Sequence, residues 1–102
     1  MLKRSVLADL RALGQSTGRQ VLEEAMERLS HDPISETRNL KTLRSNPVAQ
    51  RELRLFGKHR ILFNVNQAAR QVTVHLVGEK RGDALIVQEE RFTAHHEDRS
   101  IE

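Results

Sequence analysis

Apolar side chains recur along this chain with two different periods. In residues 5–13 and again in residues 19–29 they return every three or four positions, which predicts two amphipathic helices. Gly14 lies where the first helix should end, and residues 16–18 supply cap and turn types. Pro33 should stop the second helix, because proline cannot continue the hydrogen-bond ladder. The pattern therefore predicts an N-terminal αα-hairpin.

After Pro33 the period changes to two, as expected of half-buried strands. Residues 34–46 form a polar connector, and an acidic, weakly helical tail is predicted at 89–100. Between them we expect three strands with short turns and a fourth short strand. These are residues 52–55, 60–65, 71–77 (ended by Gly78) and 84–87.

Two helices followed by closely connected strands predict an α+β fold. The αα-hairpin should pack on one face of a small, mainly antiparallel sheet and leave the other face open, with a short acidic tail at the C-terminus. A chain of 102 residues has room for one core, so residues 1–102 are predicted to form a single domain.

Strand alternation predicts what each sheet face carries. The helix-facing set is Leu53, Leu55, Ile61, Phe63, Val72, Val74 and Leu76, and the open-face set is Glu52, Arg54, Arg60, Asn64, Thr73 and His75. Lys80 and Arg81 should close over one end of the open face. Arg54 and Arg60 should lie near each other, which calls for a carboxylate such as Glu52 between them or for an anionic ligand. A network of ordinary surface ion pairs is the alternative.

The distribution of charge supports an anion-binding surface. The net charge is +3, but residues 38–60 carry seven basic residues against one acidic residue, and residues 83–102 carry six acidic against two basic residues. This pattern favours local contact with a polyanion, and a solvated charged surface is the alternative.

Composition narrows the other possibilities. The chain has no cysteine, which excludes disulfides, thiolate zinc sites and a cysteine nucleophile. No signal-peptide pattern and no membrane-spanning apolar run is present, so we expect a cytoplasmic protein without membrane contact. Residues 95–98 include side chains that can bind a metal, but neighbouring residues of a helix point in different directions and cannot chelate together. Residues 78–82 lack the strand–loop–helix context of a nucleotide-binding loop. We expect no metal and no cofactor.

Four motifs in this order resemble the RelE/ParE toxin family of bacterial type II toxin–antitoxin systems. They are the helical hairpin ending at residues 31–33, Asn39-Leu40-Lys41-Thr42-Leu43, the run from Glu52-Leu53-Arg54 to Arg60-Ile61-Leu62-Phe63, and residues 72–77 followed by Gly78-Glu79-Lys80-Arg81. The resemblance covers residues 5–90. It implies a toxin that a cognate antitoxin wraps and inactivates, and the expected assembly is a heterocomplex with the antitoxin or a homodimer.

The resemblance implies two versions of the activity. RelE-type toxins enter the ribosomal A site and cut messenger RNA, whereas ParE-type toxins poison DNA gyrase without catalysis of their own. A degenerate member that only binds its antitoxin is a third possibility. The basic middle of the chain favours the RelE version, an endoribonuclease that inhibits translation.

RNA cleavage requires a base for the ribose 2′-hydroxyl, charge stabilisation for the phosphorane, and a proton for the leaving oxygen. The resemblance assigns phosphate binding to Arg60 and Arg81, whose guanidinium groups suit it. It places Arg54 at a strand position that some members use as acid or base. His75 is the expected base, with His59 and Glu52 as alternatives. Further contacts with RNA phosphates are expected from Lys41, Arg44, Lys58, His59 and Lys80.

Two features depart from the family. RelE-like nucleases often carry a tyrosine near the C-terminus, whereas this chain has none, and the matching position falls near Val87. Family members also begin with a strand, whereas only residues 1–4 precede the first helix here. The sheet could therefore have an uncovered edge for an antitoxin segment, a second copy of the chain or a segment encoded upstream.

Overall fold

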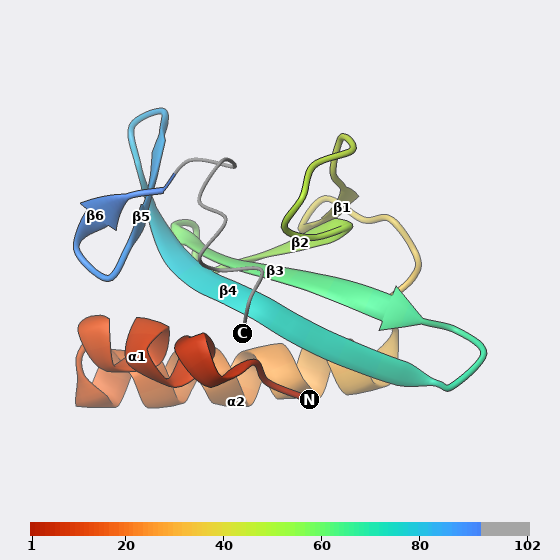
Figure 1. Ribbon diagram of the computed structural model, residues 1–102. Helices are drawn as coiled ribbons and strands as arrows, with labels where there is room; N and C mark the ends of the chain where they lie inside the picture. The colour runs from red at the N-terminus through yellow and green to blue at the C-terminus, as the bar shows by residue number, and fades with distance from the viewer. Residues whose placement is uncertain (93–102) are drawn as a thin grey trace.

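Two helices pack against one face of a six-stranded sheet whose strands are ordered as in the chain, from β1 to β6 (Figure 1). This computed structural model describes residues 1–92. All neighbouring strands are antiparallel, which confirms the predicted α+β class. The elements are α1 (Arg4–Ala12), α2 (Gln15–His31), β1 (Leu40–Thr42), β2 (Arg51–Leu55), β3 (His59–Asn66), β4 (Gln71–Arg81), β5 (Ala84–Val87) and β6 (Glu90–Arg91).

The helical hairpin has a tighter connection than the sequence suggested. Gly14 has φ 94°, a conformation that glycine adopts readily, and α2 begins directly after it. Residues 16–18, expected in the turn, therefore lie in the first turn of α2. Gly18 serves packing, because a Cβ there would lie 2.5 Å from the Leu10 carbonyl oxygen of α1. The predicted end of α2 before Pro33 is confirmed.

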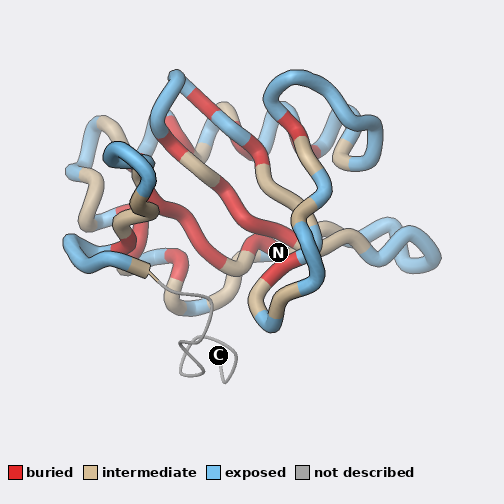
Figure 2. The backbone as a smooth tube through the Cα atoms, turned by 90° about the horizontal axis from the view of Figure 1, so that it is seen from above, coloured by how far each residue is buried: buried red, intermediate tan, exposed pale blue. Residues whose placement is uncertain are grey.

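The main core lies between the helices and the sheet. Val6 of α1 and Val21 of α2 meet Ile61 and Phe63 of β3, and all four are fully buried. Figure 2 shows this burial running through the central strands, while the connecting loops are exposed. The predicted helix-facing residues other than Leu76 all belong to this core or pack against it.

A β-bulge in β4 reverses which residues face the helices. Leu62 pairs with Leu76 and Phe63 with Val74, which leaves His75 as the extra residue on β4. Leu76 consequently packs on the sheet face away from the helices, and Val77 takes the helix-facing place. The prediction that Leu76 faces the helices is wrong, because strict alternation does not allow for an inserted residue.

The sheet face away from the helices is less open than predicted. A second apolar cluster covers part of it, formed by Leu62, Leu76 and Val87 from strands and by Ala49 from the loop at residues 43–50. Leu43, Val48, Leu85 and Phe92 pack against this cluster. The polar part of this face is therefore confined to the region beside the cluster.

Three strand predictions were incomplete. Residues 40–42 form β1 within the expected connector, and β4 continues past Gly78 to Arg81. Gly78 does not end the strand: it lets β5 approach, because a Cβ there would lie 2.7 Å from the Ile86 carbonyl oxygen. Glu90 and Arg91 form β6 where a weak helix was expected. The remainder of the predicted tail, including residues 95–98, lies outside the described residues.

The first residues of the chain cover part of the β4 edge. Leu2 forms a parallel bridge with Val74, supported by the Lys3 N–H donating to the Val74 carbonyl at 3.0 Å and the Val74 N–H donating to the Met1 carbonyl at 2.8 Å. At this place the uncovered edge expected from the sequence is not present. Within residues 1–92 no helix is long and apolar enough to cross a membrane.

Candidate functional site

The β2–β3 hairpin brings two arginines together on the sheet face away from the helices. Arg54 and Arg60 are direct partners in the antiparallel register. The Glu52 Oε1 atom lies 2.9 Å from Arg54 Nε and 3.9 Å from Arg60 Nε. The predicted placement of a carboxylate between the two arginines is confirmed. It offsets the repulsion that two like charges would otherwise have across a strand pair.

The two arginines differ in how firmly they are held. The Arg60 side chain is only 12% exposed, and its Nη1 atom donates to the carbonyls of Gly57 and His59, each at 3.2 Å. Arg54 is 45% exposed and has the Glu52 contact. Arg60 is thus fixed in position by the adjoining turn, while Arg54 remains accessible to a ligand from solvent.

Two lysines share this face. Lys41 pairs with Glu52 across β1 and β2. Lys80 follows Gly78 by two positions, and Gly78 pairs with Arg60, so Lys80 points to the same side of the sheet. We call Lys41, Glu52, Arg54, Arg60 and Lys80 the arginine face. Of the predicted site residues, the structure gathers Lys41, Arg54, Arg60 and Lys80 here.

Arg81 lies on the other side of the sheet. Because the bulge shifts the alternation, Val77, Glu79 and Arg81 all point toward the helices. Arg81 Nε donates to Glu79 Oε2 at 2.9 Å, and Lys58 Nζ lies 3.3 Å from Glu79 Oε1. The hydrogen bond from Arg81, more than the nearby Lys58, holds the pKa of Glu79 below its usual value. The expectation that Arg81 closes over the open face is therefore wrong.

Lys58, His59, Glu79 and Arg81 form a second polar cluster, which we call the Glu79 cluster. They line a cavity of about 240 Å³ under the junction of α1 and α2. The first turn of α2 contributes Thr17 to its wall, and the β5–β6 turn contributes Gln88. Two of the expected phosphate-binding residues, Lys58 and His59, thus lie away from the arginine face.

His59 is deeply buried at the start of β3. Its residue exposure is 4%, and among residues 1–92 its Nδ1 atom has no hydrogen-bond partner. Burial lowers the pKa of His59, an effect that the negative charge of Glu79 opposes. The Phe56 ring contacts it edge-on, with centroids 6.3 Å apart and planes at 82°.

His75 occupies the bulge and is half-buried. Burial lowers its pKa, and the positive charge of Lys3 acts in the same direction. An unprotonated imidazole at neutral pH suits a general base. However, the Ile61–Val77 and Leu62–Leu76 pairs separate His75 from the register position of Arg60.

Arg44, another expected phosphate-binding residue, lines a pocket with Asn64, at the end of β3 away from Arg60.

Asp9 is a structural residue that the sequence interpretation did not identify. It is 1% exposed; its Oδ2 atom accepts the Val77 N–H at 2.9 Å, and its Oδ1 atom accepts from Gln88 Nε2 at 2.7 Å. Its position between Val6 and Leu13 on the apolar stripe of the first helix was the available signal. Asp9 links α1 to β4 and to the β5–β6 turn.

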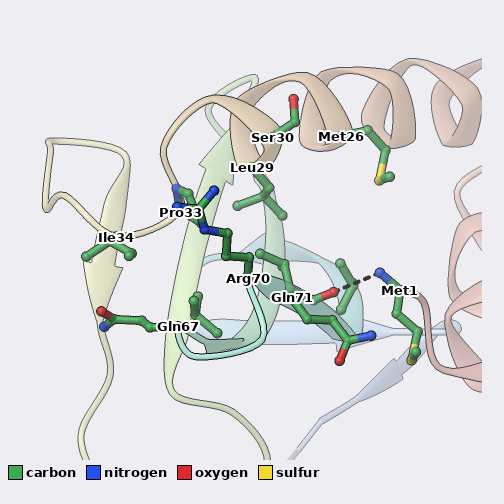
Figure 3. A pocket seen from close by; sticks show the side chains of 12 residues that line it. Met1, Met26, Leu29, Ser30, Pro33, Ile34, Gln67, Arg70 and Gln71 are labelled. Carbon is green, nitrogen blue, oxygen red and sulfur yellow. Dashed lines mark hydrogen bonds between the residues drawn. The ribbon is translucent and has the colours of Figure 1, made fainter.

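A larger cavity of about 570 Å³ lies between the end of α2 and the β3–β4 turn, and its lining is mostly apolar. Figure 3 shows Met26 and Leu29 on the helix facing this space, with Pro33, Arg70 and Met1 around it. The Met1 ammonium group donates to the Val72 carbonyl at 2.7 Å at one side. We call this cavity the apolar groove, and none of the predicted site residues lines it.

No family model, curated protein or solved structure matches this chain.

The geometry alone therefore indicates what the site can do. The arginine face offers a fixed guanidinium, an accessible guanidinium and a carboxylate within one small area, a set suited to binding a phosphodiester. Among residues 1–92 no three histidine, aspartate or glutamate side chains gather where they could hold a metal ion. The described side chains of this face can therefore act on a ligand through their charges and hydrogen bonds.

Proposed function

We propose that this chain is a RelE/ParE-type toxin that inhibits translation by binding and cleaving messenger RNA on the ribosome. The observation that carries the proposal is the pairing of Arg54 with Arg60 around the Glu52 carboxylate. The order of the helical hairpin and antiparallel strands agrees with the fold that the sequence resemblance implies. Such a toxin would act in the cytoplasm.

In this proposal the arginine face holds the scissile phosphate. Arg60 and Arg54 stabilise the negative charge of the phosphorane, because a guanidinium group presents two N–H donors to two phosphate oxygens. Glu52 accepts the proton of the ribose 2′-hydroxyl. The 2′-oxygen then bonds to phosphorus, the bond to the 5′-oxygen breaks, and that oxygen takes a proton from water. The products are a 2′,3′-cyclic phosphate and a 5′-hydroxyl end.

Glu52 is a better candidate for the base than His75 or His59. Glu52 lies among the arginines, whereas two register positions separate His75 from Arg60, and His59 is buried on the other side of the sheet. A base must reach the proton that it removes, so position decides between the three.

The apolar groove beside α2 supports an antitoxin partnership. Its lining includes Met26 and Ile34, which are exposed apolar side chains. A hydrophobic segment of a cognate antitoxin would cover them and remove their contact with water. This groove lies apart from the arginine face, so the antitoxin could bind here while another of its segments blocks the RNA site.

The second candidate is a ParE-like inhibitor of DNA gyrase that has no catalysis of its own. Arg60 and Arg81 point to opposite sides of the sheet, each held by its own carboxylate, so they do not meet on one phosphate. The absence of tyrosine also favours inhibition by binding.

The test uses purified protein in a reconstituted translation reaction, with messenger cleavage mapped by primer extension and a gyrase supercoiling assay in parallel. We expect wild-type protein to cut messenger and the Arg54→Gln, Arg60→Gln variant to lose that activity. Arg70→Gln, which removes an exposed arginine of the β3–β4 turn, is the matched control. Intact messenger together with inhibited supercoiling would establish the ParE-like alternative instead.

A further inference from the structure

Phe56 stands exposed at the tip of the β2–β3 turn. Its side chain is 59% exposed, and its backbone has φ 52°, a region that bulky residues rarely adopt. Gly57 follows with φ 76°. A turn of this geometry would be more stable with glycine, asparagine or aspartate in the first place. Neither burial nor backbone preference therefore accounts for a phenylalanine here.

Cationic groups lie on both sides of Phe56. On the side away from the helices are Arg54 and Arg60 of the arginine face, while Lys58 and Arg81 of the Glu79 cluster lie on the helix side. The Lys80 N–H donates to the Lys58 carbonyl at 2.7 Å, which joins the end of β4 to this turn. The turn is thus an edge with an exposed aromatic ring between two positively charged clusters.

Two carboxylates in this region, those of Glu52 and Glu79, are already engaged, and Glu89 lines the same cavity as Lys58 and Arg81. Glu52 contacts Arg54 and Arg60, and Glu79 contacts Lys58 and Arg81. Lys58 and Arg81 nevertheless keep more than half of their side chains exposed, so both can also contact a ligand. With more cations than carboxylates, the edge around Phe56 is complementary to an anionic chain.

We propose that a single strand of nucleic acid crosses the β2–β3 turn, with one base stacked on Phe56. Its phosphates contact Arg54 on one side of the turn and Lys58 and Arg81 on the other. Single strands fit this arrangement because their bases are free to stack on an aromatic ring while cations track the backbone. A duplex does not fit, because its bases are already stacked and it resists bending around a narrow edge. Identification of the strand as RNA rests on the proposed function.

His59 helps to position the Phe56 ring. Its buried imidazole meets Phe56 edge-on, which limits the orientations of the exposed ring. Phe56 could instead serve only as an apolar cover for His59. Replacement by leucine separates the two roles, because leucine keeps an apolar side chain over His59 and lacks an aromatic face for stacking.

The test measures fluorescence anisotropy with labelled 12-nucleotide oligouridylate RNA, the equivalent DNA strand and a 12-base-pair RNA duplex. We expect the wild-type protein to prefer both single strands over the duplex. Phe56→Leu should weaken single-strand binding about 5- to 150-fold, the usual effect of removing one base–aromatic stack. Phe56→Tyr should stay within about threefold of wild type, because tyrosine keeps an aromatic face. Leu7→Ala, which removes an exposed apolar side chain from α1, should bind as wild type does.

Salt dependence distinguishes the stacking from the charged contacts. Lys58→Gln and Arg81→Gln should each reduce the slope of log affinity against log salt by about 0.7 for each phosphate that is no longer neutralised, whereas Phe56→Leu should leave the slope unchanged. Thermal unfolding of each variant verifies that it is folded. A folded Phe56→Leu protein that binds single strands as tightly as wild type overturns the proposal, and so does equal affinity for the duplex.

The outcomes of this binding test can be told apart from the outcomes of the cleavage test for the proposed function. Binding that depends on Phe56 without any messenger cleavage would refute the nuclease and support the strand path. Messenger cleavage with binding that is unchanged in Phe56→Leu would support the nuclease and refute the path.

Discussion

Arg54 and Arg60 face each other across the β2–β3 hairpin, and the carboxylate that separates them comes from Glu52, two residues before Arg54 on the same strand. Three charged groups are therefore placed by a single register. A slip of β2 by one residue would turn Glu52 and Arg54 toward the helices and leave Arg60 on the other face, so the core packing of Leu53 and Leu55 also fixes the site.

Removal of the Glu52 charge should leave the two arginines repelling each other. We expect Glu52→Gln to lower the free energy of unfolding by about 1 kcal/mol, as measured by urea denaturation at low salt. In an Arg54→Gln background the same change should cost less, because one of the like charges is gone. Equal costs in the two backgrounds would show that Glu52 does not couple to Arg54.

Asp9 should matter for stability despite its position on a helix. In the wild-type protein one Asp9 oxygen accepts the Val77 N–H and the other accepts the Gln88 side-chain amide. Asp9→Asn leaves a single acceptor oxygen for these two donors. We expect a loss of about 1–3 kcal/mol in the free energy of unfolding, since a buried donor is left without its acceptor. Asp83→Asn, at an exposed turn, is the control and should change stability by less than about 0.5 kcal/mol.

The close approach of the two helices makes Gly18 sensitive to substitution. A Cβ at this position would lie 2.5 Å from the backbone oxygen of Leu10, so Gly18→Ala has to push α1 and α2 apart. We expect a destabilisation of about 1–3 kcal/mol, although alanine is the better helix former. Ser16→Ala, in the same helical turn but exposed, should be nearly neutral. A Gly18→Ala protein as stable as wild type would contradict the close packing of the helices.

The buried histidine predicts how stability changes with pH. Burial lowers the pKa of His59 below its ordinary 6.5, so below that pH the unfolded chain binds a proton that the folded protein resists. The stabilisation is complete above pH 6.5 and is lost as the pH falls through the folded-state pKa. We expect wild-type protein to be less stable at pH 5.5 than at pH 7.5 by urea denaturation, and this difference to shrink in His59→Gln.

Burial lowers the pKa of His75 as well, so His59→Gln should remove only part of the pH dependence of stability. His31→Gln, at the exposed end of α2, is the matched control and should leave the wild-type difference in place. A wild-type protein with equal stability at the two pH values would contradict the burial of His59.

The helical hairpin and the β2–β3 hairpin could be predicted because their periodicity and turns are local. Arg54 and Arg60 were placed together for that reason, and Glu52 with them. The bulge at His75 could not be predicted, because Val72, Val74 and Leu76 continue an unbroken alternation while the chain inserts one residue. That single insertion placed Arg81 on the helix side, whereas Lys80 lies on the arginine face as expected.

The roles of Gly18 and Gly78 and the presence of the apolar groove were not predicted for a different reason. Gly18 and Gly78 suggested a turn and a strand end, whereas each is glycine because another backbone passes close to it. Such contacts join segments far apart in the chain, so a local pattern does not reveal them. The apolar groove beside α2 combines residues from the N-terminus, α2 and β4 and was missed for the same reason.

The most direct test of the central claim is the rate of messenger cleavage in reconstituted translation, with the new 3′ ends analysed chemically. The account predicts 2′,3′-cyclic phosphate ends for wild type and a decrease of at least about 100-fold in cleavage rate for Arg54→Gln, Arg60→Gln, since removal of each guanidinium group from the phosphorane raises the barrier. Arg70→Gln should cleave at the wild-type rate. Cleavage by the double variant at the wild-type rate would contradict the account.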